Sequence, residues 1–189
     1  MDNDTLEFQE IYETYYPRIY RYLTRLLGKY YSEDVAQEVF TKIAFKLGEF
    51  KGESRLSTWV YRIATNAALD LVRSSGFRKQ EPITIAPDNS NNRLNVSSSI
   101  EQQLIRQEMN QCIYSLIDNL PPNYRMVLFL SEFEGLKNSE IAEILNLSLD
   151  NVKIRLHRAR SKLKKEMIIH CEFYRDERNE LACEQKREN

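Results

Sequence analysis

The side chains most suited to chemistry in this 189-residue sequence are the cations at positions 153–165, where seven residues are Lys or Arg and none is acidic. Arg and Lys neutralise phosphate oxygens, and in a major groove they can pair with O6 and N7 of guanine. A second segment, residues 51–79, contains six Lys or Arg against two acids. The formal net charge is only −1, so this asymmetry predicts two separate contacts with a polyanion. Solvated helix faces are the alternative interpretation.

Residue types needed for catalysis or cofactor binding are scarce. The sequence contains two His and three Cys, and its five Gly form neither a phosphate-binding loop nor a dinucleotide-binding fingerprint. No nucleophile, base and acid occur in a pattern typical of an active site. We therefore expect no catalytic residues, no enzymatic activity and no cofactor.

Weak candidates for metal ligands lie near the C-terminus. They are His170, Cys171 and Cys183, and the spacing of the two Cys matches no standard zinc pattern. We therefore predict no metal site. Exposed cysteines in such an acidic segment are either incidental or part of a sensor, and exposure alone does not establish reactivity. Three Cys are too few for a disulfide framework and fit a reducing compartment.

The elements that position the basic run are two helices. Apolar spacing predicts a short helix over 138–145 and a longer one over 148–165, joined by the brief turn of a DNA-binding helix-turn-helix. Ala142 is small where the helices would cross, and Asn146 tolerates the left-handed backbone that a tight turn needs. Val152 would be the buried contact between the two helices.

The longer helix has two different sides. Its inward stripe consists of Val152, Leu156, Ala159 and Leu163. Its other sides are positive through Lys153, Arg155, His157, Arg158 and Arg160. Turn spacing, caps and uncompensated charge together favour DNA binding over a basic amphipathic helix that binds a protein or nothing.

The N-terminal half has helical spacing too, with a polar surface of its own. We expect a helix with Ser32 as its cap, in which Asp34, Gln37 and Glu38 point outward. Taken alone, this is an ordinary solvated face.

Residues 50–66 interleave aromatic and basic side chains. Unpaired bases stack on aromatic rings while Arg and Lys hold the backbone, so this pattern suits single-stranded DNA. Core packing of Phe50 and Trp59 is the alternative.

Between the two halves the helical pattern is lost. Residues 78–98 contain two Pro and a run of Asp, Asn and Ser, which predicts a flexible linker. No convincing alternating strand occurs, so we expect an all-α chain of two small helical domains, 1–77 and 99–166, and an acidic C-terminal tail, 167–189. No apolar run is long enough for a membrane helix and the acidic N-terminus does not suit a secretory signal, which favours a soluble, cytoplasmic protein.

Three segments together resemble one known family. They read DVAQEVF at 34–40, FKGESRLSTWVYRIATNAALD at 50–70 and LPPNYRMVLFLSEFEGLKNSEIAEILNLSLDNVKIRLHRARSKL at 120–163. Over roughly residues 5–166 the chain is similar to the extracytoplasmic-function (ECF) sigma factors of bacterial RNA polymerase, with the segments in the same order. Unrelated helix-turn-helix proteins do not carry the first two segments.

The resemblance implies a promoter-specificity subunit without enzymatic activity. Residues 1–77 would be sigma region 2 and residues 99–166 sigma region 4, and together they would direct transcription initiation at promoters. The implied partners are core RNA polymerase, through its β′ clamp and β subunit, promoter DNA and an anti-sigma factor. In the family, region 2 docks on the clamp and captures a flipped base of the −10 element, while region 4 places its recognition helix in the −35 major groove.

The resemblance also implies site residues. For core polymerase they are Asp34, Gln37, Glu38 and Phe40. For the −10 element they are Phe50, Trp59, Arg62 and Asn66. For the −35 element they are Lys153, Ile154, Arg155, His157 and Arg158. The chain departs from the family at Ile154, where a small or polar residue is common, and at Lys137, where a capping Ser or Thr is common.

Two other functions stay open at this point. One is a one-component helix-turn-helix regulator that binds duplex DNA without polymerase, with its N-terminal helices sensing a ligand. The other is a helical adaptor that binds proteins through its basic helix and shows only weak, sequence-independent affinity for DNA.

Overall fold

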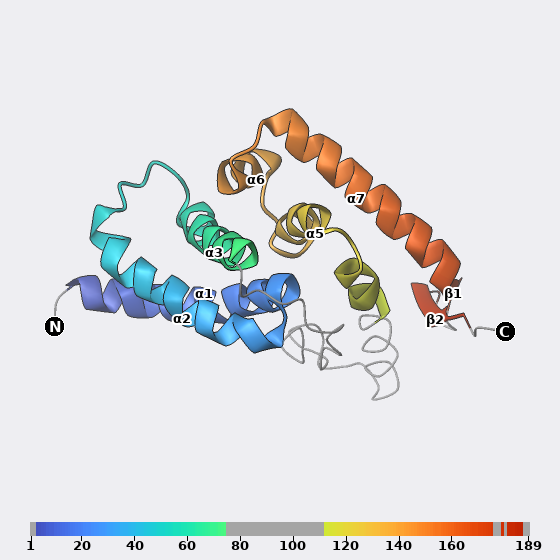
Figure 1. Ribbon diagram of the computed structural model, residues 1–189, viewed down its shortest axis with the longest axis horizontal. Helices are drawn as coiled ribbons and strands as arrows, with labels where there is room; N and C mark the ends of the chain where they lie inside the picture. The colour runs from blue at the N-terminus through green and yellow to red at the C-terminus, as the bar shows by residue number, and fades with distance from the viewer. Residues whose placement is uncertain (1–2, 75–111, 176–178, 180, 187–189) are drawn as a thin grey trace.

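The computed structural model describes residues 3–74, 112–175, 179 and 181–186. The linker predicted over 78–98 lies outside the described residues. The predicted all-α class is confirmed, with one small hairpin added near the C-terminus (Figure 1). In these described ranges, no helix combines the length and the apolar character needed to cross a membrane.

Three helices form the N-terminal module, residues 3–74. They are α1 (Asn3–Leu27), α2 (Lys29–Lys46) and α3 (Leu56–Arg73), with a short turn, η1 (Leu47–Glu49), after α2. Their apolar stripes face one another, because residues three or four apart share one side of a helix. The fully buried side chains include Ile19 and Leu23 of α1, Val39 and Ile43 of α2, and Val60 and Ala64 of α3.

The start of α2 differs from the prediction. The cap is Gly28, with a φ of 86° that favours glycine, and Ser32 lies inside the first turn. The Ser32 hydroxyl is buried and donates to the carbonyl oxygen of Lys29 at 3.0 Å. A serine hydroxyl can bond the backbone at a cap or within a helix, so the residue type did not decide between the two positions.

The C-terminal module, residues 112–170, begins with a helical segment over 112–118. It continues through α5 (Pro122–Leu128), the π-helical turn η3 (Phe129–Phe133), α6 (Asn138–Leu145) and α7 (Leu149–His170). Proline suits the first turn of α5, where its missing N–H costs no hydrogen bond. The fully or nearly fully buried side chains include Val127, Leu130, Ile141, Ile144, Val152 and Leu156.

The chain after α7 is not a plain acidic tail. An antiparallel hairpin of β1 (Cys171–Arg175) and β2 (Leu181–Gln185) follows α7 directly (Figure 1). The prediction that no strand occurs is wrong for this segment. A two-stranded hairpin is marginal alone, and this one buries Cys171 and Cys183 in a small cluster with Leu116.

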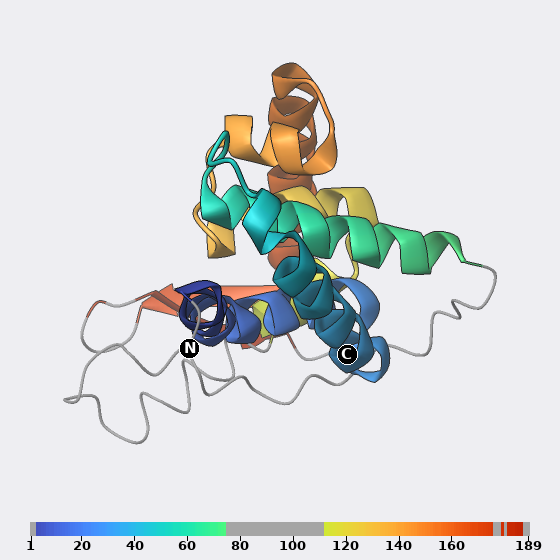
Figure 2. The ribbon, with the colours of Figure 1, turned by 90° about the vertical axis from the view of Figure 1, so that its left-hand side faces the viewer.

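The two modules pack directly against each other, with α3 lying between α1 and α6 (Figure 2). The ring centroids of Tyr22 and Phe129 are 5.5 Å apart. The side chain of Glu134, just after η3, is 0% exposed and its carboxylate lies 2.8 Å from a guanidinium nitrogen of Arg18. Arg21 approaches the same carboxylate at 3.8 Å. A buried anion on one module is thus balanced by two cations on the other.

Removing the charge of Glu134 should weaken this packing. Glu134→Gln keeps the shape of the side chain but removes the anion, and hydrogen bonds to charged groups contribute about 1.5–3 kcal/mol. Because Arg18 is partly exposed, we expect the free energy of unfolding in urea to fall by about 1–2 kcal/mol.

The matched control for this substitution is Glu38→Gln. Glu38 is exposed and pairs with Lys42 one turn along α2, so its loss should cost no more than about 0.5 kcal/mol. Equal losses of stability in the two variants would contradict the structural importance of the buried carboxylate.

Candidate nucleic-acid interface

The turn between α6 and α7 has the predicted helix-turn-helix geometry. Asn146 ends α6 in the left-handed conformation, with φ 50° and ψ 53°. The Ser148 hydroxyl accepts a hydrogen bond from the backbone N–H of Asn151 at 3.3 Å, which caps α7. Val152 is fully buried and Ala142 is half-buried where the helices meet. The local signals read from the sequence are confirmed.

The start of α6 lacks a capping hydroxyl because Lys137 occupies the cap position. Its backbone N–H instead donates to Oε2 of Glu140 at 2.7 Å. This is one half of a capping box, so one of the free N–H groups at the helix start is satisfied. The departure at Lys137 therefore leaves the position of α6 unchanged.

One side of α7 is packed and the opposite side is exposed. Val152, Leu156 and Ala159 are buried against the rest of the module. The predicted −35 residues comprise exposed Lys153, His157 and Arg158, half-buried Arg155, and Ile154, which is 48% exposed. Residues four apart share a helix face, so Lys153 with His157 and Ile154 with Arg158 form one surface.

Some cations of α7 form ion pairs with acidic side chains of the protein, and others do not. Lys153 lies 3.4 Å from Asp150, and Nε of Arg160 donates to Glu132 at 3.0 Å. Among the described side chains, the predicted −35 residues Arg155 and Arg158 make no ion pair. A cation without an internal partner is available to a phosphate or a guanine.

The outward face of α2 is polar. Asp34, Gln37 and Glu38 are exposed along one side of the helix, and Glu38 pairs with Lys42. Phe40 is not part of this surface, because it is buried and packs on the rings of Tyr12 and Tyr16 (centroids 5.0 and 5.5 Å away). Its assignment as a surface contact is corrected: Phe40 holds α2 against α1.

The aromatic residues predicted to meet single-stranded DNA are partly internal. Trp59 is 9% exposed and its ring centroid lies 5.1 Å from that of half-buried Phe50. Core packing therefore accounts for Trp59, and Phe50 forms the edge of that core next to the 51–55 loop. Asn66 is exposed on α3, one turn beyond half-buried Arg62.

This part of α3 faces the other module. Arg62 donates to Glu143 of α6 at 3.0 Å, and Arg55 lies 3.5 Å from Glu140. Arg62, a predicted −10 residue, and Arg55, which lies in the aromatic and basic segment 50–66, are thus paired with acids of α6. No sequence signal indicated this pairing, since Arg62 and Glu143 are 81 residues apart.

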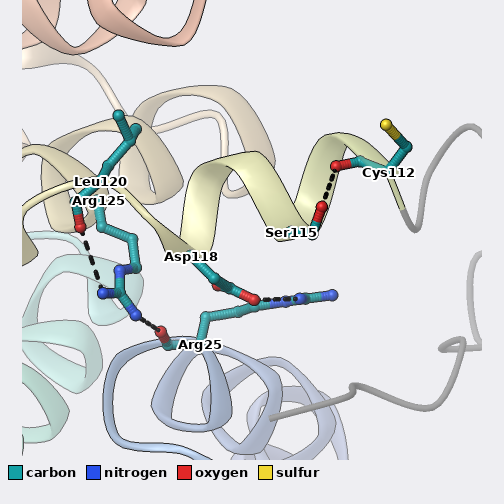
Figure 3. Close-up of polar contacts among 6 residues, drawn as sticks. All are labelled: Arg25, Cys112, Ser115, Asp118, Leu120 and Arg125. Carbon is teal, nitrogen blue, oxygen red and sulfur yellow. Dashed lines mark hydrogen bonds and ion pairs between the residues drawn. The ribbon is translucent and has the colours of Figure 1, made fainter. Parts of the chain in front are cut away.

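Sequence reasoning also missed two buried arginines between the modules (Figure 3). Arg25 lies 3.3 Å from Asp118 and 3.8 Å from the ring centroid of Tyr114. Arg125 donates to the carbonyl oxygens of Arg25 at 2.8 Å and Leu120 at 3.3 Å. Burial raises the pKa of Asp118 while Arg25 and Arg125 oppose that rise, and burial lowers the pKa of Arg125. Both cations are buried and bonded within the protein, where they connect the two modules.

The weak metal candidates are only partly brought together. Cys171 and Cys183 meet beside Cys112, whereas exposed His170 lies 3.6 Å from Glu166 of α7. In the part of the chain that the structure describes, no three His, Cys, Asp or Glu side chains are arranged to hold a metal ion. The expectation that these cysteines are exposed is wrong, since Cys171 and Cys183 are both buried.

Comparisons with known proteins account for both modules. The family model described as Sigma-70 region 2 matches residues 11–78, and that described as Sigma-70, region 4 matches residues 110–163. The ECF RNA polymerase sigma factor SigW of Bacillus subtilis is 33% identical over 168 residues, which are 85% of this chain and 88% of the relative. The ECF RNA polymerase sigma-E factor of Haemophilus influenzae is 30% identical over 165 residues, with coverage of 85% and 87%.

The chain belongs to the ECF RNA polymerase sigma factors. As a sigma factor it directs transcription initiation by RNA polymerase. Its fold is similar to that of the sigma factor RpoE solved in complex with the anti-sigma factor NepR from Bartonella quintana. That comparison has a TM-score of 0.63 at 19% identity and covers 86% of this chain and 98% of the other.

The turn that orients the recognition helix of this sigma factor should depend on Asn146. A side chain with a Cβ in the left-handed conformation costs about 1–2 kcal/mol, a cost that Asn partly offsets and that Gly avoids. We expect Asn146→Ala to lower the free energy of unfolding by about 1 kcal/mol and Asn146→Gly to leave it the same or higher. Urea denaturation of both variants measures this, and equal losses would contradict the strained turn.

Proposed function

We propose that the exposed side of α7 reads the −35 element in the major groove. The observation that carries this proposal is Arg158, which projects opposite the packed stripe and has no ionic partner among the described residues. A free guanidinium can bind O6 and N7 of one guanine, while Arg155 neutralises a phosphate. Lys153 can do the same when a phosphate replaces the exposed carboxylate of Asp150. The exposed Ile154 would supply an apolar contact, such as one to a thymine methyl group.

The −10 element is proposed to bind along the 50–57 loop and the start of α3. Exposed Asn66 and the Arg62 guanidinium would contact the strand, while half-buried Phe50 offers an aromatic ring on which a flipped base can stack. Trp59 would act indirectly by supporting Phe50 from the core. Base extrusion costs a few kcal/mol, and these contacts must offset it.

The polar face of α2 is proposed as the docking surface for the β′ clamp of core polymerase. Asp34, Gln37 and Glu38 are exposed, and the buried rings of Phe40, Tyr12 and Tyr16 fix the helix that presents them. A rigid helix loses little conformational entropy on docking, which favours this face over a loop.

Simultaneous contact with both promoter elements would require the modules to separate. The −10 and −35 elements are about 25 base pairs apart, or about 85 Å at 3.4 Å per pair. Here Arg62 of the proposed −10 surface directly contacts α6 of the helix-turn-helix. We therefore propose that the packed arrangement is a closed state of the free protein, which opens on core polymerase.

A closed state also suits an inhibitory partner. One structural neighbour was solved with an anti-sigma factor, and we propose that this chain also has a partner of that class. The same proposal places the protein in the cytoplasm, where polymerase and promoter DNA are found, and gives it a binding role without a catalytic step.

Loss of Arg158 should reduce recognition of the −35 sequence. In holoenzyme assembled with core polymerase, Arg158→Ala should lower affinity for a matched promoter by about 1–3 kcal/mol for each hydrogen-bonded base that it no longer reaches. It should change affinity for a promoter with a scrambled −35 element much less, because phosphate contacts do not depend on sequence. Competition binding with the two promoters measures the difference.

Arg160→Ala is the control on the same helix. It removes the same charge, but Arg160 is hydrogen-bonded to Glu132 and is not proposed to contact a base. Its loss should therefore weaken binding to both promoters alike. If Arg158→Ala also affected both promoters equally, the proposed base contact would be rejected. Failure of both variants and the parent to direct run-off transcription with core polymerase would reject the −35 proposal altogether.

Charge reversal on α2 should weaken assembly with core polymerase. In the double variant Gln37→Lys/Glu38→Lys we expect at least a tenfold loss in affinity for core polymerase, because like charges placed in a contact are repulsive. The helical CD spectrum should be unchanged, since both side chains are exposed.

The matched control is Gln9→Lys/Glu10→Lys. Gln9 and Glu10 are an exposed Gln-Glu pair on α1, so the charge change is identical at a different surface. This control should retain the parent affinity. Equal losses in the two double variants would show a general charge effect and reject the α2 docking surface.

A further inference from the structure

The three cysteines converge beside the end of the recognition helix. Sγ of Cys112, at the start of the helical segment 112–118, lies 3.4 Å from Sγ of Cys171, the first residue of β1. Cys171 is 2% exposed, and Cys183 of β2 is buried in the same cluster. Leu116, Leu163 and Met167 supply the apolar surroundings. All three cysteines are free thiols.

This convergence is a property of the fold. Cys112 and Cys171 are 59 residues apart, and the helix-turn-helix lies between them. Cys171 pairs with Gln185 in the hairpin ladder, which makes Cys183 its diagonal neighbour on the same face. The thiols of Cys112 and Cys171 are already in contact, and a bond of about 2.05 Å needs only a short closing movement.

We propose that Cys112 and Cys171 form an intramolecular disulfide when the protein meets a hydroperoxide, and that this bond ties the C-terminal hairpin to the helical segment 112–118. This role goes beyond transcription initiation. Disulfides in reducing compartments are typically transient and redox-sensing, which is consistent with cysteines that are free at rest.

The chemistry proceeds in two balanced steps. The half-buried Cys112 is more accessible than buried Cys171, so its thiolate attacks the peroxide oxygen. The O–O bond breaks, the alcohol leaves, and Cys112 becomes a sulfenic acid. The Cys171 thiol then displaces water from that sulfur to form the S–S bond. Two thiols lose two electrons in all, and the hydroperoxide is reduced to an alcohol and water.

The local environment makes this a slow switch. Burial, together with Cys171, raises the pKa of the Cys112 thiol to about 11, and burial raises the pKa of Cys183. Because the thiolate is the reactive form, little of Cys112 is reactive at neutral pH. As long as the pH is below that pKa, the rate of disulfide formation should rise about tenfold for each unit by which the pH is increased. The bond therefore forms under sustained oxidant and not under brief exposure.

A disulfide fits this site better than a metal ion. Thiolates do bind Zn²⁺, but a structural zinc site needs four converging ligands. No group of even three suitable side chains is arranged for a metal in the described part of the chain. His170, the nearest additional ligand in sequence, lies against Glu166.

The bond would act on the end of the recognition helix. Cys171 directly follows α7, and Cys112 begins the segment whose other end, Asp118, contacts Arg25 of the N-terminal module (Figure 3). In the oxidised protein the hairpin, the C-terminal end of α7 and this segment would move as one unit. In the reduced protein only non-covalent contacts hold the hairpin to the segment 112–118.

The test uses the full-length purified protein, reduced and then treated with hydrogen peroxide. After alkylation and digestion, mass spectrometry should find a peptide pair linked through Cys112 and Cys171 and lighter by two hydrogen atoms, and free thiols should fall from three to one. Hydrogen exchange at the amides of 181–185 should slow at least tenfold in the oxidised form. Reduction by dithiothreitol should restore both values.

Three serine variants separate the possible outcomes. Cys112→Ser and Cys171→Ser should abolish the linked peptide and the slower exchange, whereas Cys183→Ser should keep both. A bond between Cys171 and Cys183, a bond between two chains, three thiols that survive the oxidant, or a metal that copurifies and blocks alkylation would each overturn the proposal. These readouts need neither polymerase nor DNA, so their failure would leave the assigned transcriptional role intact.

Discussion

The burial of one apolar stripe of α7 is the constraint on which the rest of the C-terminal module depends. Val152, Leu156 and Ala159 must lie against the preceding helices, and this burial fixes the rotation of α7 about its axis. Once that rotation is set, the exposed cations can point only away from the module. The direction of the proposed DNA-contacting surface is therefore a consequence of core packing and does not depend on repulsion or attraction among the charges.

Ion pairs between the modules engage part of the basic charge of the N-terminal module. Acids of the C-terminal module hold cations of the N-terminal one, as in the pairs Arg62–Glu143, Arg55–Glu140 and Arg18–Glu134. The exposed face of α7 is outside this arrangement, since Arg158 has no such partner in the described ranges. In the closed state the proposed −35 surface is thus available while part of the proposed −10 surface is neutralised.

The sequence was most informative where the controlling contacts are local. The helix-turn-helix could be predicted because Asn146, Ser148 and Val152 lie within a few residues of the turn they define. The exposure of Asp34, Gln37 and Glu38 on α2 was predicted correctly, but Phe40 was grouped with them although it is buried. Spacing alone separates the two sides of a helix well, and resemblance to a family does not replace that information.

Features that depend on distant partners were not predictable from local patterns. The 171–175 strand has weak alternation, and it is stabilised through Cys171, whose neighbour Cys112 lies 59 residues earlier. The contacts of Arg25 and Arg125 likewise join positions about 100 residues apart. Local propensity carries no information about such pairs, because they form only when the two modules meet.

The contacts between the modules differ in what their loss would cost, and this difference determines how the closed state can open. Arg62 and Glu143 are each about 40% exposed, so their pair contributes little and water readily replaces it. Glu134 is fully buried and becomes solvated only when α1 and η3 part, at which point its desolvation penalty is also relieved. Opening would therefore begin at the α3–α6 edge, where the proposed −10 residues lie, and would end at the buried carboxylate. Core polymerase can drive this sequence only by binding the open form more tightly than the closed one, since equal affinity for both would shift nothing.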